Sequence, residues 1–437
     1  MGRKIHVAVL DDGIFTGKYI LPTLLHCVKI QNCQLQAPYQ NPQPQRVTSH
    51  GTVCAAIIHH YAPQVQLSSV KIIFGEQRTG SPDDLIAGID WCLSHHVDVV
   101  HLSIGTVESR DFQKVGAKIH QAAQQGLIFV AAQSNSRRYT YPACLSDVIG
   151  VRQRPIYRGP QYRMNRDALN CVDILASSSH ELPLLDGTVH YTAICNSFAA
   201  PLITAKVASL MGNGQYPTTK EELCSLLSRE KDCLAKEPYD PYFQAINNCV
   251  PNQQVAVLSA SEFGKVESLK EKQFFIFRQK LTDKQRCQIC CYKRRYFEPG
   301  EYEKRLKTKW TEEKTELPII SFATGKRELD KTFSLQMEQE IFAQSYYPAI
   351  LSSELEDSGQ GWFFCPPGIQ GYPAACTIAK EMRPDILILC SVPEPRADIL
   401  VEYRAGQFAV TSEEGVQSYS APETVIRAVC GLVFEDE

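Results

Sequence analysis

Short apolar runs alternate with helical patterns through the first half of this chain. Five runs have the length and composition of buried strands, namely His6–Leu10, Leu67–Ile73, Val97–Ser103, Leu127–Ala132 and Val148–Val151. Helical patterns fall between and after them, at Thr52–His60, Ser81–Ser94, Asp111–Gln125 and Ser197–Met211. A helix between two strands favours parallel pairing, because it returns the chain to the same edge of the sheet. The sequence therefore predicts a mostly parallel α/β sheet flanked by helices, and the polar stretch Leu25–Val47 is expected to be a surface loop.

Three of these segments carry reactive side chains. The first strand leads into Asp11, Asp12 and a glycine, a helix opens at His50, and another helix opens at Ser197. A serine hydroxyl becomes a nucleophile when an imidazole accepts its proton, and that imidazole needs a carboxylate on its other nitrogen. Ser197 is thus a candidate nucleophile and His50 a candidate base. Asp11 is the candidate carboxylate, with Asp12 as the competing one.

The order Asp, His, Ser along the chain resembles the subtilisin-like serine proteases, the subtilases. The resemblance runs from about Lys4 to about Met211 and includes the flanking residues of each motif, such as Ser49–Ala56 and Asn196–Pro201. It implies a subtilisin-like fold and a Ser-His-Asp triad. Because the family's triad carboxylate directly follows the strand, it also selects Asp11 over Asp12.

The same resemblance implies residues that bind the substrate. The strand pattern 126–135 ends in Asn135, which would donate to the oxyanion, an interaction worth about 3–4 kcal/mol when one such donor is removed. The segment Ser103, Ile104 and Gly105 would pair with the substrate backbone, and Ser134 would border the primary pocket.

The two residues that directly precede Ser197 differ from the family pattern. The usual glycine and threonine are replaced by Cys195 and Asn196. Asn196 could restore an oxyanion donor through its side-chain amide, whereas Cys195 adds bulk beside the substrate. We therefore expect slow or narrow proteolysis. The alternative is a subtilase-like protein that binds peptides with impaired catalysis.

Composition limits the remaining classes of function. A net charge of −3 over 437 residues gives no general attraction to nucleic acid or membranes, and no apolar run is long enough to span a bilayer. The triad pattern begins near Met1, which leaves no room for a signal peptide and predicts a cytoplasmic protein. The 17 cysteines are expected to be reduced thiols. The cluster Cys287–Cys291 lacks a second ligand pair, so we expect no metal and no cofactor.

The chain is long enough for more than one domain. We assign 1–237 to the protease domain, 238–316 to a partly charged linking region, and 317–437 to a second, smaller α/β domain. The last resembles a P-loop domain, with a strand, a glycine loop and Lys331-Thr332 at a helix start, but Asp330 replaces the second glycine. A carboxylate there would repel phosphate, so nucleotide binding is expected to be lost.

Together these features predict a serine endopeptidase that acts through an acyl-enzyme. A fused second domain would raise the local concentration of one substrate, and such an arrangement suits narrow processing, for example cytosolic removal of a leader from a ribosomally made precursor peptide. The expected partner is a peptide or protein substrate. An exposed sheet edge near the C-terminus could also bind a second copy of the chain as a homo-oligomer.

Overall fold

The structure is a computed structural model of the 437-residue chain. It describes residues 4–36, 49–75, 79–107, 111–136, 138, 140–145, 147–165, 172–234, 255–270, 272, 274–292, 294–300, 314–353, 362–365 and 371–434. The chain divides into two compact units, Met1–Pro241 and Tyr242–Glu437. The boundary assigned from the sequence, between residues 237 and 238, lies outside the described residues.

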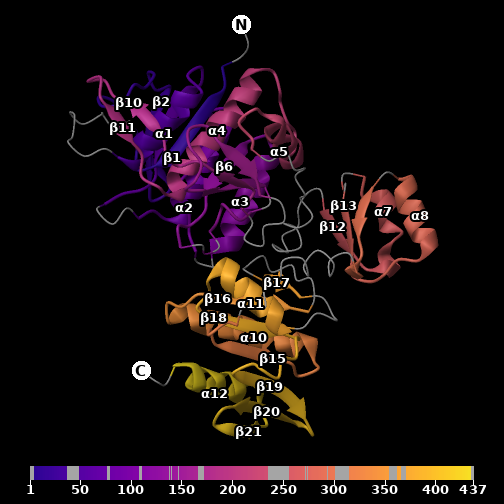
Figure 1. Cartoon of the computed structure of the whole chain (residues 1–437). Helices are drawn as coiled ribbons and strands as arrows, with labels where there is room; N and C mark the ends of the chain where they lie inside the picture. The colour runs from indigo at the N-terminus through magenta and orange to yellow at the C-terminus, as the bar shows by residue number, and fades with distance from the viewer. Residues whose placement is uncertain are drawn as a thin grey trace. The chain divides into compact units, whose positions relative to one another are not determined.

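A nine-stranded sheet forms the centre of the first unit (Figure 1). Its order is β3 (Gln34–Gln36), β2 (His26–Gln31), β4 (Gln66–Lys71), β1 (His6–Asp11), β5 (Val99–Leu102), β6 (Ile128–Ala132), β7 (Val148–Gln153), β9 (Ile174–Ala176) and β8 (Tyr162–Met164). All neighbouring pairs are parallel except β2–β3 and β8–β9 at the two edges. The predicted mostly parallel α/β sheet is confirmed.

Part of the stretch expected to be a loop is an edge of this sheet. β2 and β3 occupy residues 26–36, within the predicted loop Leu25–Val47. β2 is half-buried along most of its length and β3 is exposed, so neither needs the apolar run by which a central strand is recognised. The remaining residues of that loop, 37–48, lie outside the described residues.

The helices of the first unit cover both faces of the sheet. α1 (His50–Tyr61) packs against α4 (Asn196–Gly212), and α2 (Pro82–Ser94) packs against α3 (Phe112–Gln124). Alternate residues of β1 point to opposite faces. Val7 and Val9 join the core cluster with Ile203 of α4, whereas Leu10 contacts α2 at Gly88, where an added Cβ would lie 3.1 Å from Leu10 Cδ2.

Smaller elements complete the first unit. A two-stranded antiparallel ribbon of β10 (Glu181–Pro183) and β11 (Val189–Tyr191) precedes α4, and α5 (Lys220–Arg229) follows it. Thr219 caps α5 by accepting a hydrogen bond from the backbone amide of Glu222. Among the residues that the structure describes, no helix is both long and apolar enough to cross a membrane, and the cysteines are free thiols.

The second unit contains two further sheets. A three-stranded parallel sheet joins β12 (Val255–Leu258), β13 (Phe274–Phe277) and β14 (Arg295–Phe297), with the helices α7 (Lys265–Ser268) and α8 (Asp283–Cys291). This segment lies within residues 238–316, which were predicted to be a linking region. Its strands are only three or four residues long, but Phe275, Phe277 and Ile289 lie in a core cluster of their own.

The seven-stranded sheet of the second unit is of the α/β type. Its order is β17 (Trp362–Phe364), β16 (Pro348–Ser352), β18 (Ile386–Cys390), β15 (Ile319–Phe322), β19 (Ile399–Arg404), β20 (Gln407–Ser412) and β21 (Gly415–Tyr419), and only the pairs β19–β20 and β20–β21 are antiparallel. The helices α10 (Arg327–Ala343), α11 (Gly371–Met382) and α12 (Pro422–Phe434) accompany it. A second α/β region is thus present, as the sequence predicted.

Asp330 stabilises the loop between β15 and α10. Its Oδ1 accepts hydrogen bonds from the Thr324 backbone amide at 2.9 Å and from Thr324 Oγ1 at 2.6 Å, and its Oδ2 accepts one from Ser391 Oγ at 2.7 Å. A phosphate bound in a P-loop would need backbone amides of such a loop. Here the buried carboxylate uses one of them; the resemblance to a P-loop and the loss of nucleotide binding both stay predictions.

Candidate active site

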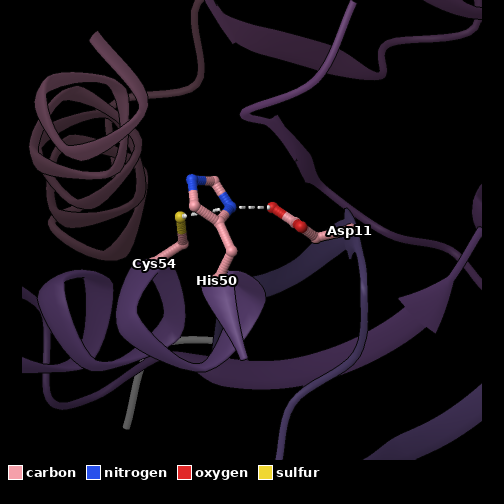
Figure 2. Close-up of side chains that lie close together, drawn as sticks. All are labelled: Asp11, His50 and Cys54. Atoms are coloured by element: carbon pink, nitrogen blue, oxygen red, sulfur yellow. Dashed lines mark hydrogen bonds and ion pairs between the residues drawn. The ribbon is translucent and has the colours of Figure 1, made fainter. Parts of the chain in front are cut away.

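Asp11 and His50 meet at the carboxyl edge of the sheet. Asp11 is the last residue of β1 and His50 the first of α1, so the strand end and the helix start bring the two side chains together. The Nδ1 atom of His50 lies 2.8 Å from Oδ2 of Asp11 (Figure 2). The carboxylate is buried, whereas the imidazole retains 16% exposure. Asp11 can therefore fix the Nδ1–H tautomer and leave Nε2 for a substrate or nucleophile.

Asp12 has a different task from its neighbour. Its two carboxylate oxygens accept hydrogen bonds from the backbone amides of His50 at 3.0 Å and Gly51 at 2.8 Å. The first amides of a helix have no partner within the helix, and a negative charge there is favourable. Asp12 therefore holds the amino end of α1 in place. Asp11, which the family resemblance selects over Asp12, is the carboxylate that contacts the imidazole.

Gly51 lets the helix start approach the strand end closely. A Cβ at this position would lie 2.8 Å from the carbonyl oxygen of Gly13 and 3.0 Å from Cβ of Asp11. Both distances are too short for a side chain. The glycine after His50 is thus required by the packing that brings His50 to Asp11.

Ser197 lies in the first turn of α4 and faces the same cleft. A cleft of about 700 Å³ is lined by Asp11, His50, Ser103 and Ser197, together with mostly apolar residues from α2, α3 and the segments that follow β4 and β5. Among the described residues, no hydrogen bond joins Ser197 Oγ to His50 Nε2. In substrate-free enzymes this contact is often long and tightens only when substrate binds.

Opposing effects act on the pKa of His50. Burial lowers it, whereas Cys54 and the hydrogen bond and charge of Asp11 raise it, and the net direction is upward. Burial raises the pKa of the Cys54 thiol, which therefore stays neutral near pH 7. We attribute the upward direction for His50 mainly to Asp11, because a carboxylate is the negative charge that an imidazolium at this position would contact.

The raised pKa of His50 predicts alkaline activity. A protonated imidazole cannot accept the proton of Ser197, so kcat/KM should rise with pH through an apparent pKa above the ordinary value of about 6.5. A pH series of initial rates on one peptide would measure this value. Asp11→Asn should move it downward. An apparent pKa at or below 6.5 in the wild type would contradict the assignment.

Asn196 is used differently from what the sequence suggested. Its side-chain Nδ2 donates to the carbonyl oxygens of Gln133 and Ser134, both at 2.9 Å, and its Oδ1 accepts from the backbone amide of Gln153. Both amide hydrogens are therefore engaged by the carbonyl groups just beyond the end of β6, away from any oxyanion. The geometry does not support Asn196 as an oxyanion donor, because a buried amide satisfies its own backbone neighbours first.

The backbone of Asn196 orients the side chain of Asn135. Its Oδ1 accepts a hydrogen bond from the backbone amide of Asn196 at 2.9 Å. With the oxygen held in this way, the Nδ2 end of the exposed side chain is the one that can donate to another group. This orientation is compatible with the predicted oxyanion role.

The predicted substrate residues fall into two groups. Ser103, Ile104 and Gly105 line the cleft, and an added Cβ on Gly105 would lie 2.4 Å from Thr140 Cγ2. Ser134 is not among the cleft-lining residues; its backbone amide donates to Thr140 Oγ1 and its hydroxyl contacts Ser136 Oγ at 2.7 Å. The structure thus brings the first three to the cleft and leaves Ser134 beside it.

The contacts of Phe198 and His180 at this site were not predicted from the sequence. The ring of Phe198 stacks on His50, with centroids 5.4 Å apart and an interplanar angle of 24°. The carbonyl of Phe198 accepts a hydrogen bond from His180 Nε2 at 2.8 Å, and Tyr61 OH donates to the other ring nitrogen of His180. Nothing in the spacing of these residues indicated such contacts, because His180 lies on a separate loop.

Cys54 completes a group of possible metal ligands. Its Sγ lies 3.9 Å from His50 Nδ1, one helical turn along α1 (Figure 2). Within the described parts of the chain, Asp11, His50 and Cys54 are the one such group, with their ligand atoms within 4.8 Å of one another. Zinc binds nitrogen and sulfur at about 2.0–2.3 Å, so small side-chain rotations would let the three atoms hold one ion.

We expect zinc to inhibit this site. The ion would replace the proton on His50 Nδ1 and break its hydrogen bond with Asp11, and a chelator should restore activity. Loss of an outer partner of a zinc ligand already lowers affinity about 10- to 100-fold, so Cys54→Ser should raise the inhibitory zinc concentration at least as much. Inhibition curves of both proteins would measure this, and equal sensitivity would rule out Cys54 as a ligand.

An aspartate–histidine pair and a serine around one cleft, at the carboxyl edge of a mostly parallel sheet, define an arrangement typical of Asp-His-Ser hydrolases. The family model described as the subtilase family matches residues 2–240, more than half of the 437-residue chain. This chain belongs to the subtilase family.

Several known proteins are similar in sequence or fold to parts of this chain. The minor extracellular protease Epr of Bacillus subtilis is 28% identical over 169 residues, which cover 34% of this chain and 23% of that protein. The major intracellular serine protease of Bacillus subtilis is 25% identical over 223 residues, covering 47% of this chain and 68% of that protein. The solved structure of the prenylagaramide maturation protease PagA has 20% sequence identity and a TM-score of 0.40, covering 56% of this chain and 94% of that one. The match to the extracellular protease Epr spans about a quarter of the length of that protein.

Proposed function

We propose that this chain is a serine endopeptidase with Ser197 as nucleophile, His50 as general base and acid, and Asp11 as the orienting carboxylate. The observation that carries the proposal is the 2.8 Å hydrogen bond between His50 Nδ1 and Asp11 Oδ2 at a cleft that Ser197 also lines. Membership of the subtilase family supports the same roles.

The proposed reaction follows from these positions. Ser197 Oγ attacks the carbonyl carbon of the peptide bond while His50 Nε2 takes its proton. Asp11 stabilises the imidazolium through Nδ1–H, and His50 then gives the proton to the leaving amine. The resulting acyl-enzyme is hydrolysed by water, which His50 activates in the same way. No metal or cofactor is part of this scheme.

Two donors are available for the oxyanion in this proposal. The backbone amide of Ser197 lies in the first turn of α4, where helical amides lack intrahelical partners, so it can donate to a substrate oxygen in place of the Cys195 thiol beside it. Asn135 supplies its side-chain Nδ2, held in orientation by the Asn196 amide. Both donors also lie at or near the amino end of a helix, where developing negative charge is favoured.

The cleft favours extended substrates with apolar side chains. Ile104 and Gly105 make no backbone hydrogen bond within the described residues, so their peptide groups can pair with a substrate strand. The wall of the cleft includes Ile72, Leu85 and Val115. We propose that the substrate is a defined peptide or protein, and specifically a precursor peptide whose leader is removed.

We also propose that the protease cleaves only a narrow range of substrates. A second unit fused to the protease unit would raise the effective concentration of one substrate. The free thiols of the described cysteines suit a reducing compartment, which supports a cytoplasmic place of action. Equal cleavage of an unfolded generic protein and of any defined peptide would contradict the precursor-peptide role.

Fluorophosphonate labelling tests the proposed chemistry. One adduct on the wild type, absent from Ser197→Ala and much slower to form in His50→Ala, is expected by intact mass. The second candidate is a peptide-binding protein with impaired catalysis, favoured by Cys195 and Asn196 in place of the family's glycine and threonine before Ser197. No adduct on the native wild type, with retained peptide binding, would favour that candidate instead.

A further inference from the structure

A proline leaves the carbonyl of Ser197 without its helical partner. In an α-helix the amide of residue i+4 donates to the carbonyl of residue i. Four residues after Ser197 stands Pro201, which has no N–H, inside α4. A carbonyl in a half-buried site needs another donor, so a group outside the helix must supply one.

Ser103 supplies that donor. Its hydroxyl donates to the Ser197 carbonyl oxygen at 2.8 Å, and the Cys54 thiol makes a longer contact of 3.6 Å with the same oxygen. Ser103 directly follows β5 and begins the segment that lines the cleft. One hydrogen bond thus joins the helix that carries the nucleophile to the strand beside which a substrate would lie.

A buried histidine fixes the direction of this hydrogen bond. His101 is fully buried in β5, with Nε2 2.9 Å from Ser103 Oγ and Nδ1 2.9 Å from Thr204 Oγ1 of α4. Because the Ser103 proton is committed to the Ser197 carbonyl, Ser103 Oγ accepts from His101 Nε2–H. His101 Nδ1 then accepts from the Thr204 hydroxyl at 2.9 Å, a shorter contact than the 3.2 Å between that hydroxyl and the carbonyl oxygen of Ala200. Burial lowers the pKa of His101 to about 3, so the ring is neutral and this tautomer persists at neutral pH.

Three side chains and one carbonyl group form a chain of hydrogen bonds in which each member donates to the next. It passes from Thr204 through His101 and Ser103 to the carbonyl of Ser197, and therefore begins and ends on α4. Thr204 lies almost two turns beyond Ser197, so the network holds α4 at two points, one of them in its first turn. Neither ring nitrogen of His101 takes part in the reaction proposed above.

We infer that His101 and Ser103 are positioning residues for Ser197. They orient the peptide unit that carries the nucleophile relative to the segment 103–105, and this inference rests on the proposed function. The backbone of that segment, rather than the Ser103 hydroxyl, would contact the substrate. Loss of the hydroxyl should therefore slow the chemical step while leaving substrate binding nearly unchanged.

The test compares Ser103→Ala with Ser103→Thr, which keeps a hydroxyl. Ser103→Ala should lower kcat and the rate of fluorophosphonate labelling about tenfold, with KM changed less than about twofold. Ser103→Thr should restore most of the rate. His101→Leu should reproduce the loss, and the double variant His101→Leu/Ser103→Ala should be no slower than either single one, because both break the same chain.

The pair His6 and Ser68 provides a matched control. It is a second buried histidine–serine contact in the same sheet, with His6 Nε2 2.7 Å from Ser68 Oγ, and it does not line the cleft. Ser68→Ala should leave kcat and labelling unchanged, while thermal unfolding reports any loss of stability in each variant. If Ser68→Ala and Ser103→Ala lowered kcat equally, the loss would come from disturbed packing of the sheet, and the inference would be wrong.

The outcomes separate the two proposals. A wild-type protein that is labelled, together with a Ser103→Ala variant of equal kcat and labelling rate, overturns the positioning role alone. A wild type that is not labelled overturns the proposed function, and the positioning role falls with it. A loss confined to KM in Ser103→Ala would also contradict the inference, because it would assign the hydroxyl to substrate binding.

Discussion

Ser197→Ala is expected to abolish proteolysis, with a fall in kcat of about 10⁶-fold. In the proposed reaction the Ser197 hydroxyl forms the acyl-enzyme, and neither His50 nor Asp11 can replace it. The residual rate should come from substrate binding and oxyanion stabilisation alone. Single-turnover assays with a peptide that carries a fluorogenic leaving group would measure the loss.

Ser209→Ala is the control for that change. Ser209 lies on the same helix, α4, and its hydroxyl accepts a weak hydrogen bond from Gln64 at 3.4 Å, away from the cleft. This variant should keep wild-type activity and stability. If Ser197→Ala retained more than about a hundredth of the wild-type kcat, a different nucleophile would have to be sought.

Asp11→Asn should lower kcat about 10⁴-fold, the second largest effect. An asparagine can occupy the same space, but it removes the charge that stabilises the imidazolium and can place the imidazole in the wrong tautomer. The pKa of His50 should fall as the charge that raises it is lost. Rates measured across a pH series would show both the lower plateau and the shifted apparent pKa.

Asp12→Asn is the natural comparison, since the two residues are adjacent. Asp12 bonds the amides of His50 and Gly51 rather than the imidazole. The substitution leaves one good acceptor of two, so we expect about 1–3 kcal/mol lower stability with kcat reduced far less than in Asp11→Asn. A chemical denaturation series beside the rate measurements would separate the effects. If Asp12→Asn proved the less active of the two, the carboxylate roles would be reversed.

Much of the first unit follows from local pattern. The predicted run His6–Leu10 corresponds to β1, and Ser81–Ser94 corresponds to α2 with its Ser81 cap. Continuous apolar runs in central parallel strands and capped helices are strong signals, because both depend on neighbours close in sequence. The edge strands β2 and β3 gave no such signal, since an exposed edge tolerates polar residues.

The second unit was less accessible to the same reasoning. β15 and α10 correspond to the strand and the helix that the P-loop-like pattern predicts on either side of the glycine loop. The patterns Gln254–Ser259 and Gln273–Phe277 predict strands close to β12 and β13, but the segment was assigned to a linking region because two short strands do not indicate a domain. Only long-range packing of Phe275 and Phe277 shows that this segment has a core of its own.

The sequence by itself determined which side chains could do chemistry and on which elements they stand. Asp11 ends a strand, and His50 and Ser197 begin helices, and these placements follow from local propensity and chain order. The tertiary structure alone decided what each neighbour does: Asp12 caps α1, Asn196 bonds the ends of β6 and β7, and the chain from Thr204 to Ser103 holds the carbonyl that Pro201 leaves free. These roles depend on the direction of hydrogen bonds between segments about 40 to 100 residues apart, and local sequence patterns carry no information about such contacts.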